Sequence, residues 1–387
     1  MSELQYWVWL SMRSAVRPEV KNALLQHCDG ARTLYFARRE DLAGLGVRLR
    51  PSEERDLLDK NLDAAGRALE ICEREGISLI TLRDAGYPAR LRLLDSAPSV
   101  LYVLGRLPMV DDRPAVAVVG TRRASQYGLK TAKTFGADIA RSGCILVSGM
   151  TDGVDGAAAE GALEQGGIVI GVTGAAIDSG FGGALSERVA RTGAVVGEFA
   201  PRDRAMQGFR MRNRITAGLA MATIVVEAPK KSGALLFADE TIEQNKEVFV
   251  VPGNVDTKSA AGSNALLMDG ARPAACAWDV LADFESEYPA LHPPGEAAAA
   301  PEPEQKGIDK ENDPAYIDME MLKKGLNEPE TLIVAALTQG ELLLDDLLER
   351  TGLASAEAMA ELTMLQIMGI VTQTPGKRYA LSITPVK

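Results

Sequence analysis

Short apolar segments alternate with longer amphipathic segments throughout residues 113–284, and this alternation constrains the fold more than any other feature of the chain. The apolar segments are rich in valine, isoleucine and alanine, which is typical of central strands buried on both faces of a parallel sheet. The expected strands are Ala115–Val119, Ile145–Ser148, Ile168–Val172, Ala194–Glu198, Ala222–Val226 and Glu247–Val251. The expected helices are Gln126–Ser142, Asp155–Gln165, Ala184–Arg191, Asn213–Ala220, Ala234–Gln244 and Ser263–Asp269. The pattern predicts an α/β fold, with a Rossmann-like doubly wound sheet and helices on both faces.

The residues before this alternation are expected to form two parts. Residues 1–66 predict a helical domain similar to SAM and helix-hairpin-helix domains, with one helix over Ser52–Ala65. Its turn Leu42–Val47 could hold a phosphate on glycine-punctuated amide groups, or its glycines could simply cap a helix. Residues 67–285 are expected to form an extended Rossmann-like domain, in which Leu101–Gly105 enlarges the main sheet.

The C-terminal residues predict a linker followed by a small domain. Residues 286–328 are rich in Pro, Ala, Glu and Lys, which predicts a flexible linker. Residues 329–387 predict a winged helix. Its expected helices are Glu330–Thr338, Glu341–Arg350 and Ala354–Met368, and its ribbon strands are Ile370–Thr374 and Tyr379–Ser382. The helix Ala354–Met368 has no lysine or arginine, so the winged helix is expected to recognise protein rather than DNA.

Composition excludes several functional classes. The 387-residue chain has a net charge of -11, so a polyanion site must be a local basic patch. Four cysteines without a C-x-x-C pair are typical of a reduced, cytoplasmic protein without a zinc site. With only His27 and His292, histidine-based catalysis is not expected, and no segment is apolar enough to cross a membrane. We therefore expect a protein that is not an enzyme and that has no cofactor or metal.

The first candidate binding segment is Gly120-Thr121-Arg122-Arg123, which follows the strand Ala115–Val119 and precedes a helix. Free amide groups and the positive end of a helix meet an anion at such a junction. A dinucleotide fingerprint would need a second glycine two residues later, but the next glycine is Gly128. Two arginines in the loop favour several phosphates along a chain over a single buried pyrophosphate.

Three further segments follow strand ends and contain residues suited to phosphate binding. Ser148 and Gly149 open a glycine-rich loop, in which Asp155 is expected to be the N-cap of the next helix. The segment Phe209–Arg214 is expected to be extended, so that its alternate arginines share one side and lead to Asn213 at the start of a helix. The last segment offers a lysine and a Ser-Gly helix start. The candidate residues from the latter two segments are Arg210, Arg212, Asn213, Arg214, Lys231, Ser232 and Gly233.

Six stretches in register resemble the DprA/Smf family of bacterial DNA-processing proteins. They are VGTRRASQYG (119–128), SGMTDGVDGAAAEGAL (148–163), FRMRNRITAG (209–218), VVEAPKKSGALLFA (225–238), NKEVFVVPGNVD (245–256) and GSNALLMDGA (262–271). The resemblance implies a single-stranded DNA-binding protein that acts in natural transformation. Such a protein protects incoming strands, loads the RecA recombinase on them and works as a homodimer.

The chain departs from the family pattern at three places. The family usually has arginine at Asp152, histidine at Ala159, and a Tyr-Pro-x-x-Asn stretch where this chain has Phe181-Gly182-Gly183. A carboxylate beside the binding loop should weaken phosphate affinity or change which strand is preferred. Two alternatives therefore stay open: a nucleotide-binding or phosphoribohydrolase-like enzyme on a related Rossmann-like fold, and a RecA-binding adaptor with weakened DNA contacts.

Overall fold

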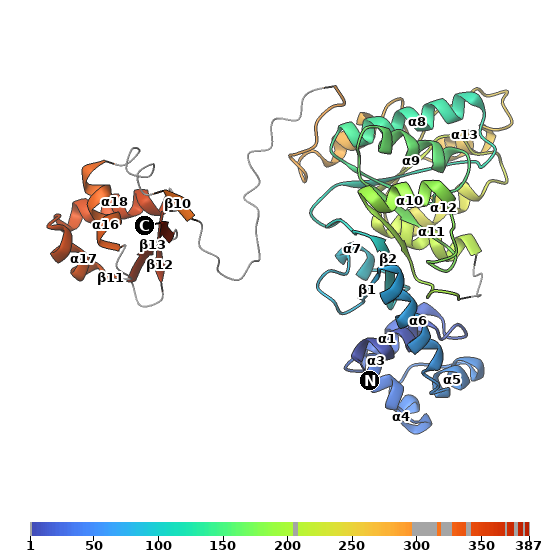
Figure 1. The fold of residues 1–387 in the computed structure, drawn as a ribbon. Helices are drawn as coiled ribbons and strands as arrows, with labels where there is room; N and C mark the ends of the chain where they lie inside the picture. The colour runs from blue at the N-terminus through green and yellow to red at the C-terminus, as the bar shows by residue number, and fades with distance from the viewer. Residues whose placement is uncertain are drawn as a thin grey trace. The chain divides into compact units, whose positions relative to one another are not determined.

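The chain divides into two compact units, Met1–Pro303 and Glu304–Lys387. The structure, a computed structural model, describes residues 2–203, 208–295, 316–318, 327–337, 342–367, 370–374, 378–381 and 384–386. Figure 1 shows both units, and each has a hydrophobic core of its own. No helix among these residues is both long and apolar enough to span a bilayer.

A nine-stranded sheet forms the centre of the first unit, in the order β1-β2-β6-β5-β4-β3-β7-β8-β9. Its strands are β1 (Ile77–Thr81), β2 (Val100–Gly105), β3 (Ala115–Val119), β4 (Ile145–Ser148), β5 (Val169–Val172), β6 (Ala194–Gly197), β7 (Ala222–Val225), β8 (Glu247–Val250) and β9 (Arg272–Pro273). The strands from β6 to β9 run parallel, while β2 joins β6 antiparallel and β1 joins β2 antiparallel. The Rossmann-like fold and the enlargement of the sheet by residues 101–105 are confirmed.

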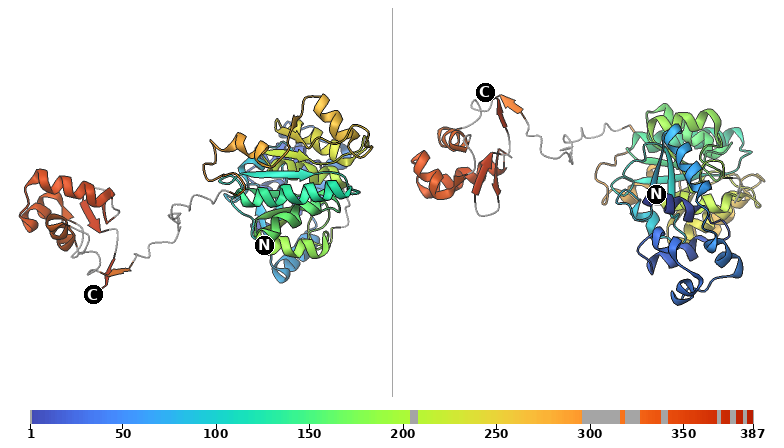
Figure 2. Two further views of the ribbon diagram at one scale, coloured as in Figure 1. Left: turned by 90° about the horizontal axis from the view of Figure 1, so that it is seen from above. Right: turned by 60° about the horizontal axis from the view of Figure 1, so that its bottom comes forward.

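Helices cover both faces of the sheet (Figures 1 and 2), because β3 turns alternate side chains to opposite faces. Val116 and Val118 belong to one core, and Ala117 and Val119 to the other. The first core contains residues of α8 (Gln126–Arg141), α9 (Val154–Glu164), α10 (Gly183–Thr192) and α14 (Trp278–Leu281). The second contains residues of α7 (Ala89–Arg92), α11 (Gly208–Leu219) and α12 (Gly233–Glu243), with α13 (Ala261–Met268) packed against it.

Short helices precede the sheet and share its first core. They are α1 (Glu3–Ser11), α2 (Pro18–Gln26), α3 (Ala31–Phe36), α4 (Arg39–Gly44), α5 (Pro51–Leu58) and α6 (Asp63–Glu75). The prediction of a single helix over Ser52–Ala65 is wrong. The Asp59 side chain accepts a hydrogen bond from the backbone N–H of Asn61, and the Asn61 side chain accepts one from the backbone N–H of Asp63. These two hydrogen bonds turn the chain between α5 and α6. Helix α6 crosses residue 66, so the expected domain boundary falls within a continuous helix.

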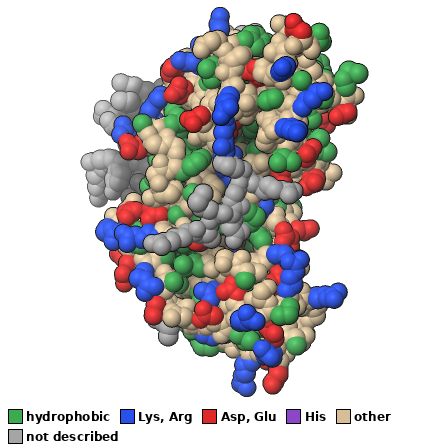
Figure 3. Space-filling model, turned by 90° about the vertical axis from the view of Figure 1, so that its right-hand side faces the viewer, with side chains coloured by type: hydrophobic (Ala, Val, Ile, Leu, Met, Phe, Trp, Pro, Cys, Tyr) green, Lys and Arg blue, Asp and Glu red, His purple; other side chains and the backbone are tan. Residues whose placement is uncertain are grey.

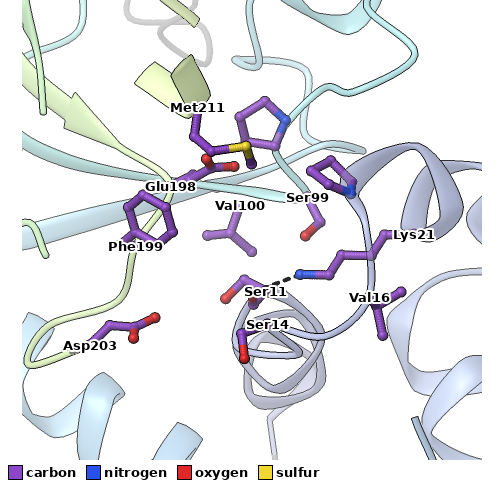
Figure 4. A pocket seen from close by; sticks show the side chains of 12 residues that line it. Ser11, Ser14, Val16, Lys21, Ser99, Val100, Glu198, Phe199, Asp203 and Met211 are labelled. Atoms are coloured by element: carbon purple, nitrogen blue, oxygen red, sulfur yellow. Dashed lines mark hydrogen bonds between the residues drawn. The ribbon is translucent and has the colours of Figure 1, made fainter. Parts of the chain in front are cut away.

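A small cavity lies where α1 and α2 meet the end of β6 (Figure 4). The ammonium group of Lys21 donates a hydrogen bond to the carbonyl oxygen of Ser11 at 2.9 Å, and Glu198 lies on the opposite wall. The cavity measures about 40 Å³, which suits water rather than a nucleotide.

The second unit contains a winged helix. It comprises α16 (Glu328–Leu337), β11 (Leu342–Leu343), α17 (Leu344–Thr351), α18 (Ser355–Ile367), β12 (Val371–Thr374) and β13 (Arg378–Leu381). The ribbon gains β11 as a third strand, in the order β11-β13-β12. A further strand, β10 (Tyr316–Asp318), lies within the segment expected to be a linker and pairs with β14 (Thr384–Val386) near the C-terminus.

The largest correction concerns α11, which begins at Gly208 rather than near Asn213. The segment Phe209–Arg214 is therefore helical and not extended. In a helix, residues two positions apart are rotated by about 200° from each other, so alternate arginines cannot share one side. Arginine and methionine are good helix formers, and this propensity prevails over the alternating pattern.

Candidate nucleic-acid interface

The sheet reverses its direction of growth at β3. From β3 the chain adds β4, β5 and β6 on one side, and it later returns to add β7 and β8 on the other. The loops that follow β3 and β7 meet here, and the backbone N–H of Thr121 donates to the carbonyl oxygen of Glu227 at 2.7 Å. Ligands of open α/β sheets bind at such a reversal, beyond the carboxyl ends of the strands.

A groove of about 720 Å³ opens at this point, which we call the central groove. It is lined by residues from the β3 loop, α9, α11 and the β7 loop. Its walls include Gly120, Thr121, Arg122, Arg123, Arg212, Asn213, Lys231, Ser232 and Gly233, all of which the sequence suggested as binding residues. The sequence therefore identified most of the residues that the fold brings together.

Three cations lie on the rim of the central groove. Arg122, Arg123 and Lys231 are all exposed. The two arginines belong to the β3 loop and the lysine to the β7 loop, which are far apart in the sequence. Figure 3 shows several Lys and Arg side chains on the upper half of one face of this unit, with acidic side chains among them. Ser232 caps α12, accepting the backbone N–H of Ala234 at 3.2 Å, so the N-terminal amide groups of that helix also lie at the groove.

Arg212 lies on the floor of the central groove and is 6% exposed. Its guanidinium Nη1 donates to the carbonyl oxygen of Gly149 at 2.8 Å. A Cβ at Gly149 would lie 2.6 Å from this nitrogen, so only glycine allows the approach. Gly149 therefore accommodates the Arg212 guanidinium, and it is not among the residues that line the central groove.

Asp155 lies beside Arg212 and is also buried. Burial raises the pKa of Asp155 to about 6, although Arg212 and hydrogen bonds from Thr151 and the Gly120 amide favour its charged form. Burial likewise lowers the pKa of Arg212, and Asp155 opposes this shift. The expectation that Asp155 is an N-cap is wrong: Gly153 caps α9, and Asp155 belongs to the first turn of that helix.

Three of the other suggested residues lie outside the central groove or outside the described side chains. The Ser148 side chain is fully buried and donates to the carbonyl oxygen of Asp155 at 3.2 Å. Arg214 forms a buried ion pair with Glu198, with Nη2 and Oε2 2.5 Å apart. The Arg210 side chain lies outside the part of the chain that is described. The helical geometry of α11 thus separates Arg212 from Arg214.

Glu227 holds two loops of the groove together and was not among the candidate residues chosen from the sequence. Its carboxylate accepts hydrogen bonds from the backbone N–H of Ser125 at 2.9 Å and from the Ser125 hydroxyl at 3.2 Å. Ser125 in turn caps α8. The available signal was an acidic residue two positions after β7, in the same loop as Lys230 and Lys231. Glu227 fixes the β3 loop against the β7 loop and thereby shapes the groove.

A second pocket of about 570 Å³ shares Arg122 and Thr151 with the central groove, and we call it the side pocket. Asp152, Phe181 and Gly182, three residues at which the chain departs from the family pattern, line it. Ala159 is fully buried in the adjacent helix α9. The departures at the surface therefore gather at one place.

Comparison with known proteins identifies the family. The model of DNA recombination-mediator protein A matches residues 78–285, and that of the DprA winged helix domain matches residues 318–377. The chain belongs to the DprA/Smf family. It is similar to Protein Smf of Synechocystis, with 32% identity over 98% of both chains. A putative DNA processing protein DprA of Mycobacterium tuberculosis is 31% identical over 96% of this chain and 92% of its own length.

A solved structure supports the same assignment. DNA processing protein A from Streptococcus pneumoniae superposes with a TM-score of 0.63 and 26% identity, covering 74% of this chain and 99% of that one. The predicted family and fold class are confirmed. The stretch matched to the DprA/Smf recombination-mediator model contains every lining residue of the central groove.

Proposed function

We propose that the central groove binds the sugar–phosphate backbone of single-stranded DNA without sequence preference. The observation that carries this proposal is the meeting of Arg122, Arg123 and Lys231 around a glycine-lined groove in a chain of net charge -11. Exposed guanidinium and ammonium groups neutralise phosphates, and the amide groups at the start of α12 add donors. Arg212 supports the floor and contributes positive potential from below.

The shape of the site favours a single strand over a duplex. A recessed groove of about 720 Å³ has room for a few nucleotides whose bases are unstacked. A rigid double helix would contact only the rim, where the cations are few. The acidic surface elsewhere would repel its remaining phosphates.

We extend the proposal to the cellular role implied by the family. The protein would protect incoming strands during natural transformation in the cytoplasm and load the RecA recombinase on them. It would do so as a homodimer through its Rossmann-like domain, because two weak sites on one strand raise the effective affinity. The apolar stretch Leu266-Leu267-Met268 of α13 is the candidate for part of the dimer interface; Met268 is exposed, and Leu266 and Leu267 are partly buried against the core.

The test is fluorescence anisotropy of a labelled oligo-dT strand across a salt series. Three phosphate contacts on a single strand predict a slope of log affinity against log salt of about −2, because each contact contributes about −0.7. We expect Arg122→Ala and Lys231→Ala each to flatten the slope by about 0.7.

Arg106→Ala is the matched control. Arg106 is exposed, and its backbone N–H donates to the carbonyl oxygen of Gly193, which directly precedes β6. It therefore lies at the amino ends of the parallel strands, whereas the groove opens at their carboxyl ends. Its slope should equal that of the unmodified protein. Equal slopes in all three variants would refute the assignment of the groove, and release of free base from a nucleotide would instead favour the enzymatic alternative.

A further inference from the structure

The side pocket is built from elements on both sides of α9. The loop after β4 supplies Met150, Thr151 and Asp152, and the start of α10 supplies Phe181, Gly182 and Leu185. Leu129 of α8 and Arg122 of the β3 loop complete the wall. A volume of about 570 Å³ lies within the range of small-molecule sites and exceeds what a nucleobase needs.

One face of α9 forms the base of the side pocket. Gly153, Gly156, Ala157 and Glu160 all line it, and their spacing of three and four residues places them on one side of the helix. The first three have small side chains or none, so this face is hollow. Glu160, one turn beyond, carries the only large side chain that α9 contributes to the lining.

The lining combines apolar surface with two carboxylates. Met150, Leu129, Leu185 and Phe181 offer the kind of surface on which a flat ring packs. Asp152 and Glu160 are exposed, and neither has an ion pair or side-chain hydrogen bond with another residue in the described part of the chain. Their oxygens are therefore available as hydrogen-bond acceptors.

Arg122 links the side pocket to the central groove, because it lines both. A phosphate bound at Arg122 would leave its own nucleoside within reach of the side pocket. The carboxylates repel phosphate, so the part of the nucleotide that enters must be the base.

We propose that the side pocket receives one unstacked guanine base from a strand held in the central groove. This inference rests on the proposed function. The base packs between the apolar side chains, and the carboxylate of Asp152 or Glu160 accepts hydrogen bonds from its Watson–Crick edge.

The donor pattern of the bases decides in favour of guanine. Guanine presents two neighbouring donors, N1–H and the N2 amino group, which match the two oxygens of one carboxylate. Adenine presents an amino group between two ring acceptors, cytosine presents an amino group beside one ring acceptor, and thymine has a single N3–H between two carbonyl oxygens. A carboxylate repels each of these acceptors. The groove therefore binds any strand, while the side pocket prefers a strand with guanine.

The experiment compares oligo-dT with the same strand carrying one central dG, using the full chain and anisotropy. We expect the dG strand to bind roughly tenfold more tightly, in line with the discrimination of a good paired contact to a base edge. Replacing dG by deoxyinosine, which lacks the N2 amino group, should remove most of the preference. Asp152→Asn and Glu160→Gln together should equalise the dG and dT strands.

Asp239→Asn is the matched control, since Asp239 is an exposed carboxylate on α12 that does not line the side pocket. It should keep the preference for dG. Equal binding of both strands by the unmodified protein would overturn the inference, as would an equal gain of affinity for both strands in the doubly substituted variant. The Arg122→Ala variant separates the two proposals. If it weakens binding of oligo-dT while the preference for dG is absent, only the side-pocket inference fails; if it leaves oligo-dT binding unchanged, the groove proposal fails as well.

Discussion

Two neighbouring arginines of α11 illustrate how the surroundings of a residue decide its role. Arg214 donates to the carbonyl oxygens of Ser96 at 3.0 Å and Met211 at 2.6 Å, in addition to its pairing with Glu198. Removing one partner of such a buried pair leaves an uncompensated charge and costs about 3–5 kcal/mol. Arg214 thus stabilises the fold, and Arg212 supports the groove.

The raised pKa of Asp155 leads us to predict that single-stranded DNA binding depends on pH. This pKa of about 6 means that Asp155 takes up a proton just below neutral pH, which removes the negative charge beside Arg212 and makes the potential at the groove floor more positive. We expect affinity to rise as the pH falls from about 7.5 to 5, with the midpoint near 6, and anisotropy at constant ionic strength would measure it. Asp155→Asn should bind with little change over the same range.

The same residue affects stability with a defined sign. Because the folded-state pKa is raised above the ordinary value of 3.8, the native state binds more protons than the unfolded state between these two pKa values. The Asp155 contribution to the free energy of unfolding therefore improves as the pH falls from about 7 to 4. A pH-independent affinity, with a normal stability profile, would show that Asp155 does not titrate near the groove.

At the scale of elements, α8 and α9 pack against each other through glycines. A Cβ at Gly136 of α8 would collide with the carbonyl oxygen of Ala158, and a Cβ at Gly161 of α9 would collide with that of Lys133. The backbones of the two helices therefore approach directly. Each helix begins beside the site, after the β3 loop and after the Gly149–Gly153 loop.

We expect Gly136→Ala to lower the free energy of unfolding by about 1–3 kcal/mol, because overpacking a close contact forces the helices apart. Chemical denaturation would measure this loss. Gly66→Ala is the control: a Cβ there would lie 3.5 Å from the nearest atom, the Gln5 side-chain nitrogen, in ordinary contact, also within a helix. An unchanged stability of Gly136→Ala would mean that the two helices can separate freely.

The accuracy of the sequence predictions at this scale follows from burial. Strands such as β3 and β4 were predicted to the residue because a continuous apolar run between polar turns has few other interpretations. The start of α11 was missed because arginines that become buried against Gly149 or Glu198 look, in the sequence, like a solvated basic run. The hydrogen bonds of Glu227 to Ser125 join residues about a hundred positions apart in the sequence, so no local sequence pattern could predict them.

At the scale of the whole molecule, we expect the first unit to bind DNA and the C-terminal unit to make no DNA contact. Helix α18 contains Glu357 and Glu361 and no lysine or arginine, whereas a recognition helix needs cations, so we expect it not to bind a duplex. We expect a chain ending at residue 303 to bind oligo-dT with the same salt slope as the full chain. A flatter slope by about 0.7 or more would instead assign a phosphate contact to the C-terminal unit.

The close approach of α8 and α9 has a thermodynamic consequence for binding. A Cβ at Gly153 would collide with the backbone of Thr121 and Arg122, so the loop before α9 packs directly against the β3 loop, as the helices behind these loops pack against each other. The conformational entropy of these loops is lost when the chain folds, and a ligand that arrives later has little of the protein left to order. Calorimetry would then assign the entropic cost of association mainly to the DNA strand, and the accompanying change in heat capacity would be small.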